Sequence, residues 1–203
     1  MASSELMARS ALAGVARLGR YGARAEGPAG VTLSEREGLA IAHIAARKDK
    51  IAEVLDWLSA VTGATAADSP RSVTGDGMVV VGCAPGQWFV VSEGERSATA
   101  VARLTDALAG IASVIDHSSG KVVVRVAGPR ARDVLAKGCA IDLDKRAFGP
   151  GSAAATEIAH IGCQLWQVDE TPTFDLAVNR SIARSFWSWL TASASEYGYE
   201  VVA

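Results

Sequence analysis

Apolar and polar positions follow two different periods along this chain, and the two periods recur in the same order in each half. In the first half, short apolar runs typical of strands alternate with segments whose apolar residues recur at helical spacing. The predicted elements are a strand over about 38–44, a helix over 49–61, strands over 78–83 and 88–91, and a helix over 97–109. Residues 62–72 are rich in small and polar residues and are predicted as a loop.

The second half repeats this plan. Its predicted elements are a β-branched strand over 121–127, a helix over 131–137, strands over 153–160, 161–168 and 173–178, and a long helix over 181–197. With an offset of 86 positions, Trp88 aligns with Phe174, Val90 with Leu176 and Leu104 with Leu190. Such a pattern is generic, so chance similarity is the alternative to duplication. We expect an α+β fold of two related β-α-β-β-α halves, 37–118 and 119–203, with mainly antiparallel sheet.

Residues 1–36 differ in composition from the segment that follows them. Glycine and proline recur too often there for a long stable helix. The first 25 residues contain four arginines (Arg9, Arg17, Arg20 and Arg24) against one acid, Glu5. That balance is also typical of an organelle transit peptide, and a disordered tail is a further alternative. We expect an extended arm that docks on a partner chain, while residues 37–203 form a single two-halved domain.

Charge and cysteine content narrow the class of protein. The 203 residues have a formal net charge of −2 and a pI near 5.9, which provides no broad basic surface for nucleic acid. No apolar run approaches the roughly 18 to 20 residues that cross a bilayer, so no membrane partner is predicted. The chain has only three cysteines, and no two of them lie close together in the sequence: Cys83, Cys139 and Cys163. An odd and sparse set favours reduced thiols in a cytoplasm over a disulfide scaffold.

Nucleotide and metal sites find little support. Gly120-Lys121 resembles the end of a phosphate-binding loop, but Ile115 replaces the glycine that the motif requires. No G-x-G-x-x-G follows a predicted strand. His160 and Cys163 lie three apart, and they face opposite sides of one strand unless a hairpin at Gly162 reunites them. No second ligand pair lies nearby, so we expect a buried thiol instead of a zinc site.

Two further features of the sequence are candidates for a function, one as a hydrolytic site and one as a partner interface. Asp116-His117-Ser118 contains the three residue types of a catalytic triad, but adjacent residues cannot form its hydrogen-bonded relay. Asp116 is expected to anchor the turn between the halves, with a ligand carboxylate as the alternative. Trp187 lies off the apolar face of the last helix. It indicates either a partner interface or a second packed layer.

Several short motifs together carry a family resemblance. In chain order they are Gly86-Gln87-Trp88-Phe89-Val90-Val91, Asp116-His117-Ser118, Gly128-Pro129-Arg130-Ala131-Arg132-Asp133-Val134-Leu135, Gly138-Cys139-Ala140-Ile141-Asp142-Leu143-Asp144, Phe148-Gly149-Pro150-Gly151 and Ser185-Phe186-Trp187-Ser188-Trp189-Leu190. This ordered set resembles the gamma subunit of bacterial heterotetrameric sarcosine oxidases over roughly residues 75–198.

The resemblance implies a fold similar to the folate-binding domain of the glycine-cleavage aminomethyltransferase. It also implies a complex with alpha, beta and delta subunits, with alpha as the expected direct contact, that oxidatively demethylates sarcosine to glycine. FAD, FMN, NAD, tetrahydrofolate and zinc are implied in the partner subunits. No catalytic, cofactor-binding or metal-binding residue is implied in this chain. The alternatives are a stand-alone folate-binding or aminomethyltransferase-like protein and a regulatory ligand-binding module.

Overall fold

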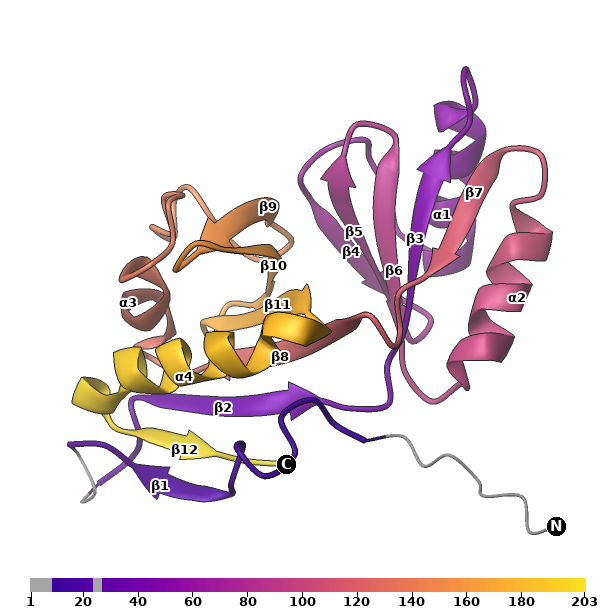
Figure 1. The fold of residues 1–203 in the computed structure, drawn as a ribbon. Helices are drawn as coiled ribbons and strands as arrows, with labels where there is room; N and C mark the ends of the chain where they lie inside the picture. The colour runs from indigo at the N-terminus through magenta and orange to yellow at the C-terminus, as the bar shows by residue number, and fades with distance from the viewer. Residues whose placement is uncertain (1–8, 24–26) are drawn as a thin grey trace, which may run out of the picture.

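Two β-sheets face each other across a shared apolar layer, and helices cover their outer faces (Figure 1). The computed structural model describes residues 9–23 and 27–203. The first sheet has the strand order β4-β5-β6-β3-β7, and its pairings are antiparallel. Its strands are β3 (Ala40–Ala46), β4 (Ser72–Gly75), β5 (Met78–Ala84), β6 (Gln87–Ser92) and β7 (Ala112–Asp116).

The second sheet is larger and has the order β1-β12-β2-β8-β11-β10-β9. Among the described strands of this sheet, β12 and β2 pair in parallel, and all other pairings are antiparallel. Its strands are β1 (Gly19–Tyr21), β2 (Val31–Arg36), β8 (Lys121–Ala127), β9 (Ala153–Ile158), β10 (Ile161–Asp169), β11 (Thr173–Asn179) and β12 (Tyr199–Val201). The first described strand, β1, and the last, β12, therefore lie next to each other at one edge of this sheet.

Helices bury one apolar face each against the outer side of a sheet. Figure 1 shows α1 (Ile51–Thr62) and α2 (Ser97–Ala107) on the side of the first sheet that faces away from the second. Short α3 (Ala131–Ala136) and longer α4 (Ala183–Ala194) cover the second sheet, and the turns η1 (Arg180–Ile182) and η2 (Ser195–Tyr197) flank α4. In α4, Phe186, Leu190 and Ala194 recur every four residues and are fully buried. This spacing places them on one helix face.

The predicted equivalence of the halves is confirmed at the level of elements. Trp88 lies on β6 and Phe174 on β11, which are the third strands counted from the β4 and β9 edges of their sheets. Each packs into the core between its own sheet and helices. The prediction missed β4, which lies partly in the expected loop, so each half reads β-α-β-β-β-α. Gly75 lets β4 approach α1, because a Cβ there would lie 1.7 Å from the Thr62 carbonyl oxygen.

The two halves exchange a strand, which the sequence pattern did not predict. Strand β7 leads directly into β8 but pairs with β3, and β2 leads into β3 but pairs with β8. The first sheet thus contains β7, which comes just before the second half, and the second sheet contains β2, which comes just before the first half. The predicted half 119–203 is therefore incomplete, since its sheet needs residues 31–36 to fill the position beside β8.

The prediction that residues 1–36 lie outside the domain is wrong for several of them. Val31 and Leu33 alternate along β2 and are fully buried, as is Leu12. Alternation with period two is the signature of a half-buried strand, and glycine and proline end before it begins. Residues 1–8 and 24–26, with Glu5 and Arg24, lie outside the described residues. Within the described ranges, no helix is both long and apolar enough to span a membrane.

Candidate functional site

A buried carboxylate lies on the inner face of the second sheet. Asp175 projects from β11 beside Trp166, is 2% exposed and accepts hydrogen bonds from two arginines. Arg125 Nε and Nη2 donate to its two oxygens at 2.7 Å each, and Arg36 Nη1 donates to Oδ2 at 2.9 Å. Glu93 of the first half pairs in turn with Arg36. The cluster connects β2, β8 and β11 and reaches the end of β6.

Both Asp175 oxygens are engaged, so the group is arranged for structure and not for proton transfer. The hydrogen bonds from Arg125 to Asp175 raise the pKa of Arg125. Burial lowers the pKa of Arg36, and the attraction of Asp175 opposes this shift. Both guanidiniums stay charged at neutral pH, because the ordinary pKa of arginine lies far above 7. This cluster was not predicted, although a charged residue interrupts an apolar strand pattern at both Arg125 and Asp175.

A second group of polar side chains lies where the two sheets meet at the start of β8. The rings of His43, Phe89 and His117 contact one another edge-on or tilted, with centroids 5.2–5.9 Å apart. Lys121 Nζ donates to Asn179 Oδ1 at 2.8 Å and lies 5.7 Å from the Phe89 ring centroid. Burial, followed by the nearby His117, lowers the pKa of His43. His43 is therefore neutral at pH 7 and does not supply a cation.

Asp116-His117-Ser118 forms the turn between the halves, as expected, and not a catalytic relay. Asp116 Oδ1 accepts from the Ser118 backbone N–H at 2.8 Å. The Ser118 hydroxyl oxygen accepts from the Ile41 N–H at 2.9 Å, and the His117 N–H donates to the Ile41 carbonyl at 2.8 Å. Gly120-Lys121 enters β8 directly and does not form a phosphate-binding loop.

The predicted cysteine and histidine candidates are not brought together. Ala159 and His160 take positive φ values of 52° and 63° and form the tight turn of the β9–β10 hairpin, two residues before Gly162. His160 is exposed there, while Cys163 is buried in the core. Burial, with a smaller effect of Cys139, raises the pKa of the Cys163 thiol to about 12. Within 9–23 and 27–203, no three His, Cys, Asp or Glu side chains are grouped to hold a metal.

Trp187 belongs to the packed layer and not to an exposed interface. It is 4% exposed and contributes to the core beneath α4. Of its two open interpretations, the second packed layer is the one that the structure supports. Trp187 also lines a surface pocket, beside Val15 and Thr191.

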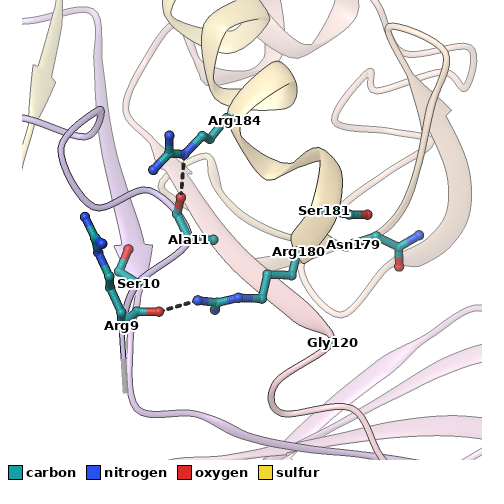
Figure 2. A pocket seen from close by; sticks show the side chains of 8 residues that line it. All are labelled: Arg9, Ser10, Ala11, Gly120, Asn179, Arg180, Ser181 and Arg184. Carbon is teal, nitrogen blue, oxygen red and sulfur yellow. Dashed lines mark hydrogen bonds between the residues drawn. The ribbon is translucent and has the colours of Figure 1, made fainter. Parts of the chain in front are cut away.

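A hollow lined by three arginines lies at the start of α4. Figure 2 shows Arg180 and Arg184 reaching from this helix end toward the N-terminal segment. The pocket has a volume of about 750 Å³, and Arg9 also lines it. Arg180 donates to the Arg9 carbonyl, and Arg184 Nε donates to the Ala11 carbonyl at 3.1 Å. No pattern in the sequence indicates that Arg9 lies beside two arginines about 170 positions away.

Comparison with solved structures defines the fold class. The chain is similar to a chain of the heterotetrameric sarcosine oxidase from Corynebacterium sp. U-96 in complex with pyrrole 2-carboxylate. The TM-score is 0.77 at 26% identity, over 94% of this chain and 96% of that one. It also shares its fold with the glycine cleavage system aminomethyltransferase T from Bartonella henselae. That TM-score is 0.63 at 15% identity, over 86% of this chain and 48% of that one. The expected aminomethyltransferase-like α+β fold is confirmed.

Sequence comparison then identifies the family. The model of the sarcosine oxidase, gamma subunit family matches residues 59–196. Proteins called sarcosine oxidase subunit gamma from Corynebacterium sp. strains P-1 and U-96 are 34% and 31% identical to the chain, over 63% and 72% of its length. These alignments span 62% and 71% of the two relatives. The chain belongs to the sarcosine oxidase gamma subunit family.

Proposed function

We propose that this chain is the gamma subunit of a heterotetrameric sarcosine oxidase and acts in it as a non-catalytic assembly subunit. The assembled enzyme would oxidatively demethylate sarcosine to glycine. The observation that carries this proposal is the family match over residues 59–196, joined to a structural similarity that covers 94% of this chain. A structural match along nearly the whole length favours a subunit of such an oxidase over a domain of an unrelated protein that shares the fold.

The chemistry of the described side chains supports a non-catalytic role. Asp175, the most buried carboxylate of the inner face, has both oxygens engaged by arginines. Burial keeps the Cys163 thiol protonated, which removes the nucleophilic thiolate at neutral pH. The hydroxyl of Ser118 is hydrogen-bonded to the backbone of Ile41. We therefore assign no catalytic, cofactor-binding or metal-binding residue to this chain.

The partners follow from the family. They would be the alpha, beta and delta subunits, with alpha in direct contact. FAD, FMN, NAD, tetrahydrofolate and zinc would belong to those subunits. A cytoplasmic location agrees with the three free cysteines, because an oxidising compartment selects for paired ones.

Expression with and without the partner chains tests the proposal. Co-expressed with tagged alpha, beta and delta chains, the protein should co-purify in one complex that oxidises sarcosine. Purified alone, it should be colourless and inactive toward sarcosine. A flavin absorption band that survives gel filtration of the isolated chain would contradict the proposal.

Folate titration of the isolated chain tests the rival function, a stand-alone folate-binding protein. Because no folate-holding residue is assigned here, intrinsic tryptophan fluorescence should not change with tetrahydrofolate. A saturable change would favour the rival function.

A further inference from the structure

Three arginines lie around the pocket at the start of α4. Within residues 9–23 and 27–203, Arg9, Arg180 and Arg184 make no ion pair. Elsewhere in the described chain, arginines commonly pair with acids, as Arg36 and Arg125 do with Asp175. The guanidiniums of Arg180 and Arg184 instead donate to backbone carbonyls of the N-terminal segment. Carbonyl dipoles do not neutralise a cation. Glu35 accepts a hydrogen bond from the pocket-lining Ser10, so three guanidiniums stand against one carboxylate and this surface keeps a local excess of positive charge among the described residues.

Exposed apolar side chains lie next to this charge. Among the described residues, seven large hydrophobic side chains are exposed, and three of them fall within one short stretch: Val15, Leu18 and Tyr21, with Leu18 66% exposed. A second pocket of about 320 Å³ shares Arg184 with the first and is lined also by Val15, Tyr21 and Trp187. We call the two pockets together with Leu18 the basic–apolar surface. Apolar and aromatic groups mixed with arginine are the composition enriched at protein–protein interfaces.

The segment that forms this surface is held in place by the second half of the domain. Leu12 is fully buried in the core beneath α4. Arg184 donates to the carbonyls of Ala11 and Ala13 at 3.1 and 3.3 Å. Strand β1 pairs with β12, where Tyr21 stacks on Tyr199 with centroids 5.3 Å apart. A surface ordered before binding loses less conformational entropy when a partner docks.

We propose that the basic–apolar surface is the docking site for an acidic, apolar-centred patch on a partner subunit of the oxidase. This inference rests on the proposed function and adds the location and chemistry of the interface. Carboxylates of the partner would pair with Arg9 and Arg180, for which charge-assisted and bidentate geometry is available. The partner's apolar side chains would cover Leu18 and the smaller pocket. The N-terminal segment thus contributes to assembly through its outer face, while its inner face belongs to this domain.

Charge reversal and apolar-to-acid substitution test the surface in the whole complex. The variants are Leu18→Asp and Arg9→Glu, singly and together, co-expressed with the tagged partner chains. Leu18 is exposed, and the Arg9 contact to Arg180 uses a backbone carbonyl, so neither change removes a contact that the fold needs. Matched controls on the first half are Ile115→Asp, at a residue 51% exposed, and Arg47→Glu. Circular dichroism of each isolated chain checks that the variants fold.

The double variant should lower retention of this chain on the tagged partner by roughly tenfold or more, which corresponds to about 1.4 kcal/mol. The controls should stay within about twofold of the wild type. Raising the salt concentration should weaken wild-type retention more than that of the double variant, because the variant has lost the Arg9 pair and keeps only the pair of Arg180. Normal assembly of the folded double variant would overturn this surface but not the proposed function. Failure of the wild-type chain to co-purify would overturn both.

Discussion

The two halves of the molecule share their outer architecture and differ on their inner faces. Toward the helices, Trp88 and Phe174 occupy equivalent strands, and both are almost completely buried. One position further along each strand, the offset of 86 pairs Phe89 with Asp175. Phe89 contacts two histidine rings, whereas Asp175 binds two arginines. The helix-facing core is thus apolar in both halves, whereas the inner faces differ in the groups that they bring to the contact between the sheets.

The edges of the sheets differ as well. The first sheet ends at β4 and β7, whereas the second continues from β8 through β2 and β12 to β1. The second half therefore holds the N-terminal segment and strand β12, and it carries Arg180 and Arg184 beside Arg9. This difference indicates that the first half completes the fold, while the second half also builds the surface available for assembly. Each prediction below tests one part of this contrast.

The largest expected effect concerns the shared outer core. Trp88→Ala and Phe174→Ala should each lower the free energy of unfolding by about 3 to 5 kcal/mol, because each leaves a cavity in a packed core. Both should shift one common transition, since the exchanged strands β2 and β7 and the apolar layer between the sheets couple the halves. Urea unfolding followed by tryptophan fluorescence and by far-UV circular dichroism measures this. Two separated transitions would show that the halves unfold independently.

The inner faces should respond unequally to truncation. Asp175→Ala should cost about 3 kcal/mol, because it leaves two half-buried guanidiniums without their carboxylate. Phe89→Ala, at the equivalent position, should cost less, since Phe89 is only partly buried. Glu93→Gln is the control: its carboxylate is exposed, and its loss should change stability by less than about 1 kcal/mol. Equal costs for Asp175→Ala and Glu93→Gln would refute a structural role of the buried carboxylate.

The third prediction concerns a segment in which the second half differs from the first. Helix α3 is half the length of α1, and a loop over 137–152 follows it. Arg132 holds this loop: its Nη1 donates to the Leu143 carbonyl and to the Phe148 carbonyl at 2.9 Å, and Nη2 donates to Gln167 at 2.8 Å. Arg132→Met should destabilise the fold by about 2 kcal/mol through the unpaired acceptors. Limited proteolysis should then cut within 137–152, whereas the control Arg130→Met should resist cleavage like the wild type.

Local patterns predicted the elements, and tertiary pairing accounts for what they missed. The offset between Trp88 and Phe174 is visible because helix-facing strand positions must be apolar in both halves. The exchange of β2 and β7 cannot be predicted from the sequence in this way, since the apolar pattern of a strand does not show which sheet the strand joins. Arg125 and Asp175 become partners only through the β8–β11 register. Arg9 meets Arg180 only because Leu12 is buried beneath α4. In each case the decisive contact joins residues at least 50 positions apart, beyond the range of periodicity.

The smallest expected effect compares the buried thiol of the second half with the partly exposed thiol of the first. Burial raises the pKa of Cys163 from 9.0 to about 12, and burial also raises the pKa of Cys83. Above pH 9 the unfolded chain releases the Cys163 proton while the folded chain keeps it, so stability is complete below pH 9 and is lost as the pH rises toward 12. Between pH 8 and pH 10 this loss should be about 1 kcal/mol. Urea unfolding at both pH values should therefore show a shallower decline for Cys163→Val than for the wild type. Cys83→Val should change the decline less, and equal declines in all three proteins would show that Cys163 is not shielded from water.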